Sequence, residues 1–279
     1  MSPWRKKSAV RVAAWIPGWV LAVVLLAGIA VAGESTAVEE NAVPGRLRIL
    51  CYNVRNTAGM DEVVDPDRTA RVIREATPDV ASLQELDRRT RRSGGTDRIV
   101  ELAERTGLVA TFGPAIDFQG GKYGVGILSK RKPILTRTVP LPGREERRVL
   151  LIAEFPGYVF FSTHFSLTAE DRLESARIIN QECEKYHGIP IFLAGDFNCA
   201  PDDEPMVELG KVWKRLSPDA PTYPADQPDL PIDHILAAGL PESARTTESR
   251  VVDAPVESDH RPVFVEVTLS PIESTTDVL

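Results

Sequence analysis

Asp196 and Asn198 are two polar residues that directly follow a short apolar run. The run, residues 191–194, is too brief for a helix and precedes Gly195, so it predicts a buried strand that the chain leaves sharply. In an extended segment, residues i and i+2 point the same way, and we expect both side chains to face one point at a sheet edge. A carboxylate and an amide there suit a base and a donor to a charged transition state. Gly195 to Asn198 alone would equally fit a capped turn.

Other residues that bind cations or transfer protons also lie at the ends of predicted strands. They are Asn53, Glu85, His164, Asp233 and the pair Asp259 and His260. Each of them has a structural alternative, since Asn and Asp cap turns and a single histidine at a strand end is commonly a structural residue. So many endings of this kind nevertheless predict a shared polar rim at one end of the sheets.

The apolar patterns predict the elements that would position this rim. Strands are expected at residues 47–53, 80–84, 124–128, 149–155, 158–163, 191–194, 232–236 and 263–269. Amphipathic helices are expected at 67–76, at 96–106 and from Thr168 onward, where a capping-box-like start occurs. Pro156 and Gly157 predict a hairpin, so the sheet order is not wholly parallel. Two mixed sheets packed face to face, with helices outside, fit this pattern better than a doubly wound fold.

The N-terminal 32 residues have the features of a targeting segment. Arg5, Lys6, Lys7 and Arg11 form a basic region, and an apolar run that is densest over residues 20–31 follows it. A small-residue site at 30–32 favours a cleaved signal peptide, whereas the uncharged stretch 12–32 would also suit a retained membrane anchor. Either alternative predicts an exported protein. We expect a linker at 33–45, one domain at 46–270 and a disordered tail at 271–279.

The charge balance limits the partners. Without the four basic residues of the first 32, 29 of the 33 Lys and Arg remain against 40 Asp and Glu, a net charge of −11. Such a body does not attract long DNA at a distance. The three cysteines are widely spaced, which predicts neither a disulfide framework nor a zinc site.

Six short segments, in chain order, resemble the motifs of the endonuclease/exonuclease/phosphatase superfamily. They are Cys51-Tyr52-Asn53, Leu83-Gln84-Glu85, Ser162-Thr163-His164, Gly195-Asp196-Phe197-Asn198, Ile232-Asp233-His234-Ile235 and Ser258-Asp259-His260-Arg261-Pro262. That group includes pancreatic-type deoxyribonucleases, abasic-site endonucleases, inositol-polyphosphate phosphatases and neutral sphingomyelinases. The resemblance covers residues 47–269 and implies a four-layer α/β-sandwich, in which two packed mixed β-sheets are flanked by helices.

The resemblance also implies a metal site and a base. Glu85 would ligate Mg²⁺ or Mn²⁺, with Asn53 and Asp259 completing or orienting the site. Asp196 would activate or orient the attacking water, and Asn198 would hold the phosphoryl oxygens. Oxygen ligands suit Mg²⁺, which binds substrate phosphate directly.

The remaining family positions concern the two histidines and an arginine. Asp233 would pair with His260 and keep it cationic, so that it stabilises the pentavalent phosphate. His164 would be the acid for the leaving oxygen, although the acidic partner of the deoxyribonuclease branch is missing from residues 123–129. Arg148 matches a phosphate-contacting arginine of that branch.

The sequence therefore predicts an exported, monomeric metal-dependent phosphoesterase that hydrolyses a phosphodiester by in-line attack of water. One substrate hypothesis is short or single-stranded nucleic acid, which the basic stretch 88–92 would receive. The alternative is a phospholipid or glycolipid head group of the glycosylphosphatidylinositol, sphingomyelin or phosphoinositide type, which the N-terminal segment and the acidic body favour. A third hypothesis is a non-catalytic binding module, against which the full motif set argues.

Overall fold

The computed structural model describes residues 44–269. The predicted signal or anchor segment, most of the linker and the C-terminal tail lie outside the described residues. None of the helices in the described part of the chain is long and apolar enough to cross a membrane. The three cysteines, Cys51, Cys183 and Cys199, are buried.

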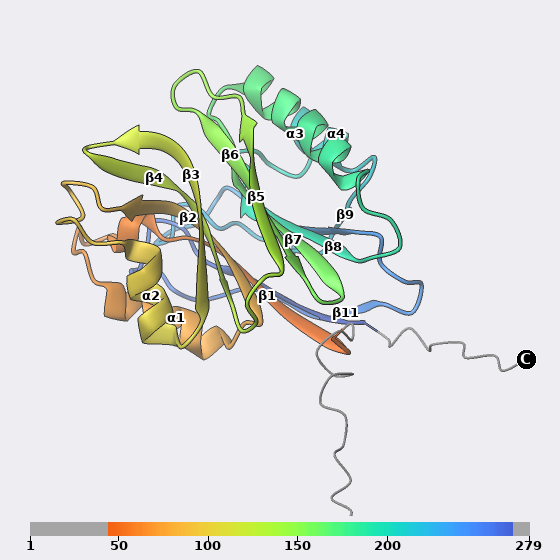
Figure 1. The fold of residues 1–279 in the computed structure, drawn as a ribbon, viewed down its shortest axis with the longest axis horizontal. Coiled ribbons are helices and arrows are strands. Elements are labelled where there is room, and N and C mark those ends of the chain that lie inside the picture. Colours follow the sequence, from red (N-terminus) through yellow and green to blue (C-terminus); the bar gives the residue numbers. More distant parts are fainter. Residues whose placement is uncertain (1–43, 270–279) are drawn as a thin grey trace, which may run out of the picture. The chain divides into compact units, whose positions relative to one another are not determined.

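Two six-stranded sheets form the centre of the domain (Figure 1). The strands of the first sheet are β1 (Arg46–Asn53), β2 (Val80–Arg88), β3 (Val109–Phe118), β4 (Gly121–Ser129), β11 (Arg245–Val251) and β12 (Val263–Thr268). Their order is β11-β12-β1-β2-β4-β3. Only β1 and β2 are parallel neighbours in it, so the sheet is mixed.

The second sheet repeats this arrangement. Its strands are β5 (Leu135–Leu141), β6 (Arg148–Phe155), β7 (Tyr158–His164), β8 (Ile191–Asp196), β9 (Lys214–Arg215) and β10 (Asp233–Ala238). Their order is β5-β6-β7-β8-β10-β9, with β7 and β8 as the single parallel pair. The carboxyl ends of both parallel pairs become the frame of the site described below.

Helices cover the outer face of each sheet. On the first sheet lie α1 (Pro66–Ala76) and α2 (Arg98–Thr106), and on the second lie α3 (Ala169–Cys183) and α4 (Glu204–Leu209), while η1 (Arg55–Thr57) follows β1. The helices pack on their sheets through two apolar clusters, and a third cluster, which includes Ile49, Phe160 and Phe192, fills the space between the sheets. Burial of these side chains from both sheets stabilises the packing. The predicted four-layer sandwich is confirmed.

The helix ends follow local chemistry. The side chain of Asp65 accepts hydrogen bonds from the backbone N–H groups of Asp67 and Arg68, so α1 begins at Pro66, one residue before the predicted start. The α2 helix begins at Arg98 rather than at Thr96, because the Thr96 carbonyl accepts the backbone N–H of Arg89 in the preceding loop.

The strands β3, β5 and β11 were absent from the sequence prediction. All three lie at sheet edges, where one side of the strand is unpaired. The residues of β11 range from exposed to half-buried, and its sequence RTTESRV carries a single apolar residue. A strand without a buried face lacks the apolar alternation that sequence prediction requires.

Candidate active site

Four of the predicted site residues lie at strand ends on one edge of the sandwich. Asn53 ends β1, and His164 and Asp196 end β7 and β8, where they are register partners. Asp233 instead begins β10, whereas the sequence prediction placed it after a strand. Because β10 runs antiparallel to β8 and pairs Asp233 with Asp196, the residue still reaches the same edge.

Glu85 lies in a bulge within β2, not at the end of this strand. The register of β2 on β4 shifts between Leu83 and Leu86, and Glu85 has φ 60°. A left-handed conformation costs a non-glycine residue about 1 kcal/mol. Bulges re-aim a side chain and occur next to active sites, and this one places Glu85 on the wall of a cleft.

Asn53 connects the carboxylates of both sheets. Its amide nitrogen donates to Oε1 of Glu85 at 3.1 Å and to Oδ2 of Asp196 at 3.0 Å, and lies 3.5 Å from Nε2 of His260. Its oxygen accepts the backbone N–H of Arg55. Both amide hydrogens thus face carboxylates, so Asn53 is placed to orient the acidic groups.

His260 is buried and held as a cation. Its Nδ1 lies 2.8 Å from Oδ2 of Asp233, which also accepts the hydroxyl of Thr222 at 2.6 Å. Burial alone would lower the pKa of His260, but the carboxylates of Asp233 and Asp196 outweigh it and raise the pKa to about 10. The structure therefore brings Asp233 and His260 together as the sequence predicted.

Asp196 and Asn198 do not share an extended segment, contrary to the prediction. Asn198 has φ 50°, and its backbone N–H turns back to Oδ1 of Asp196 at 2.9 Å. Its amide nitrogen donates to the carbonyl of Phe165 at 3.0 Å, which fixes the side chain. Both residues still line one cleft, but a left-handed turn brings them there.

His164 faces a guanidinium in place of an acid. Nη1 of Arg148 lies 3.2 Å from Nδ1 of His164, and since arginine can only donate, Nδ1 accepts and Nε2 carries the hydrogen. That Nε2 lies 3.4 Å from Oδ2 of Asp196. Burial, reinforced by Arg148 and opposed by Asp196, lowers the pKa of His164 to about 3. The ring is therefore neutral at pH 7.

The charge of Arg148 is already balanced. Its guanidinium lies 3.4 Å from Oε1 of Glu145 and 3.0 Å from Oε1 of Glu146, and its side chain is only 7% exposed. The sequence analysis did not identify Glu145 and Glu146, and nothing in the run before Arg148 distinguishes them from solvated acids. Arg148, which also lines the cleft described below, thus connects these partly exposed carboxylates to His164.

These groups surround a cleft of about 380 Å³. Its lining residues are Glu85, Tyr123, Glu146, Arg148, His164, Leu167, Asp196, Asn198, Tyr223, Leu230, Ile232, Asp259 and His260. Of the predicted site residues, Asn53 and Asp233 are absent from the lining and bind the cleft residues by the hydrogen bonds above. Tyr123 and Tyr223 are additions that sequence reasoning missed; the ring of Tyr223 packs 4.8 Å from that of His260.

The cleft fits a divalent cation. Burial and the neighbouring carboxylates of Asp259 and Asp196 raise the pKa of Glu85, against the hydrogen bond from Asn53. Such a concentration of carboxylates is relieved by a hard cation, which prefers oxygen ligands. Ligand atoms of Asp196, Asp233 and His260 also lie within 4.8 Å of one another. In that second group Asp233 and His260 already pair with each other, which leaves Glu85 and Asp259, whose side chains line the cleft, as candidate oxygen ligands.

Sequence comparison agrees with this geometry. The sequence profile of the Endonuclease/Exonuclease/phosphatase family matches residues 50–260, which include all the site residues. The chain belongs to this family. Its members are phosphoesterases, and the chain is accordingly a hydrolase of phosphate esters. Comparison with curated protein sequences gives no match.

Solved structures of the endonuclease/exonuclease/phosphatase family share the fold. A family protein from Beutenbergia cavernae DSM 12333 is 26% identical with a TM-score of 0.69, over 81% of this chain and 72% of that chain. The mannosyl-6-phosphatase of Bacteroides thetaiotaomicron VPI-5482 is 17% identical with a TM-score of 0.64, over 79% and 99% of the two chains. The human Nocturnin catalytic domain, solved with a sulfate anion, is 17% identical with a TM-score of 0.63, over 82% and 96%.

Proposed function

We propose that the protein is a divalent-metal-dependent phosphodiesterase that cleaves a P–O bond by in-line attack of water. The observation that carries the proposal is the placement of Asp196. Its Oδ2 lies 3.4 Å from Nε2 of His164 and 3.7 Å from Nε2 of His260, at a cleft whose walls hold Glu85 and Asp259. A base, two hydrogen-bond donors and a set of carboxylates meet where one phosphate could bind.

Asp196 would orient the water and accept its proton. The amide of Asn53 and the backbone N–H of Asn198 hold this carboxylate in place. Glu85 and Asp259 would hold Mg²⁺ or Mn²⁺, with Asn53 orienting Glu85. Such a cation supplies Lewis-acid stabilisation of the charge that develops on the phosphoryl oxygens.

The two histidines would serve different purposes. His260, which Asp233 keeps cationic, would stabilise the negative charge of the pentavalent transition state. His164 is neutral and presents Nε2–H, so it would donate a hydrogen bond to the leaving or phosphoryl oxygen. Arg148 would position His164, since its charge is balanced by Glu145 and Glu146. The side-chain amide of Asn198, which also lines the cleft, would hold a phosphoryl oxygen.

The preferred substrate is a phosphodiester of the nuclease type, short or single-stranded. Phospholipid and glycolipid head groups are the second candidate, which a feature of the cleft mouth favours. Leu167 and Leu230 line the cleft yet are 66% and 47% exposed, so they offer an apolar surface beside the phosphate site. The N-terminal segment supports export, and membrane association if the segment is retained.

A substrate panel tests metal dependence and substrate class together. We would compare rates on bis-p-nitrophenyl phosphate, a single-stranded oligonucleotide and a vesicle of phosphoinositide or sphingomyelin, each with Mg²⁺, Mn²⁺ or EDTA. Turnover that requires metal and disappears in Glu85→Ala supports the proposal, and the faster natural substrate identifies the class. Equal rates with Mg²⁺ and EDTA would refute the metal-dependent chemistry.

A further inference from the structure

A second cleft, of about 710 Å³, lies at the same edge of the first sheet as Asn53 and Glu85. It is formed by the arginine loop (residues 88–97, following β2) and by the tip of the β3–β4 hairpin. Its lining residues are Arg88, Arg89, Asp117, Phe118, Gln119, Gly120, Gly121 and Lys122. None of these residues has a role in the proposed chemistry.

The walls of this cleft are held by hydrogen bonds. The backbone N–H groups of Arg91 and Arg92 donate to the carbonyl and the side chain of Gln119, at 3.1 and 2.9 Å. The fully buried Asp87 accepts two hydrogen bonds from the guanidinium of Arg92, at 2.6 and 2.9 Å. These hydrogen bonds therefore hold the loop and the hairpin tip together as one unit.

Close backbone packing joins the loop to the hairpin tip. A Cβ atom at Gly121 would lie 2.3 Å from the carbonyl oxygen of Arg88 and 2.5 Å from the carbonyl carbon of Arg89. Only glycine fits at this contact, so the floor of the cleft is backbone. The cationic side chains are consequently left to project from the loop into the open space.

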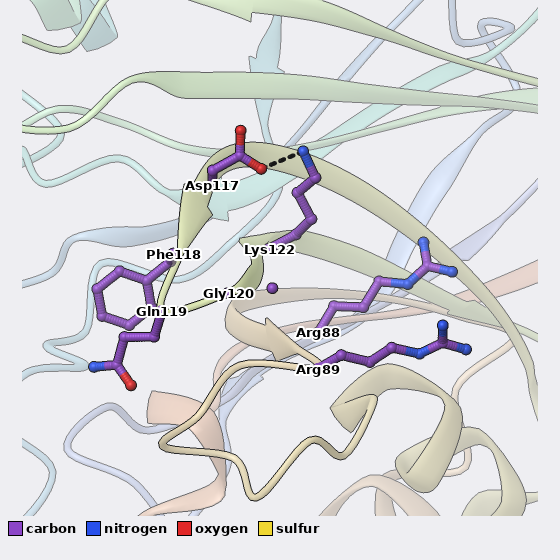
Figure 2. A pocket seen from close by; sticks show the side chains of 8 residues that line it. Arg88, Arg89, Asp117, Phe118, Gln119, Gly120 and Lys122 are labelled. Carbon is purple, nitrogen blue, oxygen red and sulfur yellow. Dashed lines mark ion pairs between the residues drawn. The ribbon is translucent and has the colours of Figure 1, made fainter.

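The cleft carries positive charge that no carboxylate balances. Arg88 pairs with Asp97, Arg92 with Asp87, and Lys122 with Asp117. Arg89 and the neighbouring, exposed Arg91 form no ion pair within residues 44–269. Figure 2 shows Arg88 and Arg89 extending in the same direction, with the Lys122–Asp117 pair beside them.

The backbone at Arg89 is itself unusual. Its φ is 57°, a left-handed conformation that glycine adopts freely and that arginine adopts under strain. The strain is tolerated in a loop whose other turns use Gly94 and Gly95.

The cleft lies within reach of the active site. Arg88 lies three positions after Glu85 in β2, which corresponds to a distance of about 10 Å along an extended strand. The guanidinium of Arg92 packs on Phe118, which lines the second cleft, and on Tyr123, which lines the first, at 4.7 and 5.6 Å from the ring centroids. One molecule with two phosphate groups could therefore occupy both clefts.

We propose that this second cleft binds a further phosphate group of the substrate, through the guanidinium of Arg89, whose charge no carboxylate of residues 44–269 balances. The inference rests on the proposed function and narrows its substrate class to molecules with at least two phosphates. An oligonucleotide and a phosphorylated inositol lipid both meet this condition, whereas sphingomyelin does not.

The test compares substrates that differ by one phosphate. One pair is p-nitrophenyl thymidine 5′-phosphate with and without a second, 3′-linked thymidylate, and the other is vesicles of phosphatidylinositol and of its 4-phosphate. In the wild type, we expect the second phosphate to raise kcat/KM about tenfold in at least one pair, as a charge-assisted contact would. Arg89→Ala should abolish this gain, and Arg177→Ala, an exposed arginine on α3, should retain it.

The pair that gains identifies the source of the phosphate. Bis-p-nitrophenyl phosphate has no second phosphate, so its rate of hydrolysis should be the same in Arg89→Ala as in the wild type. If the wild type did not hydrolyse it, the proposed function would be refuted, but the inference about the second cleft would not. In that event calorimetric titration of pyrophosphate into the wild type and into Arg89→Ala still tests the cleft. The inference would be overturned if the second phosphate changed kcat/KM by the same factor in the wild type and in Arg89→Ala. Equal affinities of the two proteins for pyrophosphate would also overturn it.

Discussion

The amide nitrogen of Asn53 lies 3.0 Å from Oδ2 of Asp196, and this hydrogen bond joins the ends of β1 and β8 across the two sheets. The same nitrogen donates to Glu85 at 3.1 Å. A single side chain thus orients two carboxylates for which we propose different roles, Glu85 for a metal and Asp196 for water. Close packing of the sheets supports it, with the hydroxyls of Ser82 and Ser162 2.6 Å apart between them.

Replacing Asn53 should uncouple these carboxylates. In Asn53→Ala, Glu85 and Asp196 lose their shared donor, and we expect kcat to fall about a hundredfold, as for the loss of an outer-shell partner. Unfolding in urea should show a loss of about 1–3 kcal/mol, because buried acceptors are left unpaired. Full activity in Asn53→Ala would show that the amide does not organise the site.

Removal of the charge of Glu85 should stabilise the folded protein when no metal is bound. Its pKa is raised by burial and by neighbouring carboxylates, so the ionised form is unfavourable in the metal-free protein. In EDTA, we expect Glu85→Gln to melt at a Tm roughly 2–4 °C higher than the wild type. Mg²⁺ should raise the Tm of the wild type and leave Glu85→Gln unchanged. A variant that still responds to Mg²⁺ would place the metal elsewhere.

The tautomer of His164 should depend on Arg148. Because the guanidinium donates to Nδ1, ¹⁵N NMR of the imidazole should show hydrogen on Nε2 and no titration between pH 5 and 9. Arg148→Leu should mix the two tautomers and lower kcat about tenfold with little change in KM. Should His164 titrate near pH 6.5 in the wild type, the neutral-donor role would be wrong.

His234 should make the domain sensitive to acid. Burial, with a contribution from Arg215, lowers its pKa to about 4, against its hydrogen bond to the Cys199 carbonyl. The pKa of His234 in the folded state lies below its value of about 6.5 in the unfolded state, so the unfolded state takes up the proton first as the pH falls. The contribution of neutral His234 to the free energy of unfolding is therefore complete above pH 6.5 and is lost as the pH falls to 4. The loss approaches about 3 kcal/mol.

Urea unfolding in EDTA between pH 4 and 7 measures this linkage. His234→Phe, which keeps a ring against Phe197, should have a shallower dependence on pH than the wild type. Lys211→Gln, which changes an exposed residue after the end of α4, serves as the control and should keep the wild-type slope. Parallel slopes in wild type and His234→Phe would assign the acid sensitivity to other groups.

The sequence alone was sufficient to predict the layers of the fold and the types of residue in the candidate site. Buried strands such as β8 can be predicted from a continuous run of apolar residues, and the polar residue that ends the run, such as Asp196, can be identified from the same pattern. The family motifs then identified which endings belong together, and the structure places those residues around one cleft.

The local geometry was not predictable, because it depends on contacts between distant segments. The bulge at Glu85 is a mismatch between β2 and β4, and the turn at Asn198 is fixed by Phe165. Likewise, Arg148 reaches His164 because β6 and β7 are neighbours, a contact between strands that the sequence did not predict. Spacing within one segment carries none of this information.

The most direct test of the proposed chemistry is the rate of bis-p-nitrophenyl phosphate hydrolysis by Asp196→Asn, with Mg²⁺ and with EDTA. Asparagine has nearly the size of aspartate but cannot accept the proton of water, and we predict a loss of about 10³-fold. His260→Ala should lose activity to a similar extent. If either variant kept more than about a tenth of the wild-type rate in Mg²⁺, the assignment of Asp196 and His260 to catalysis would be contradicted.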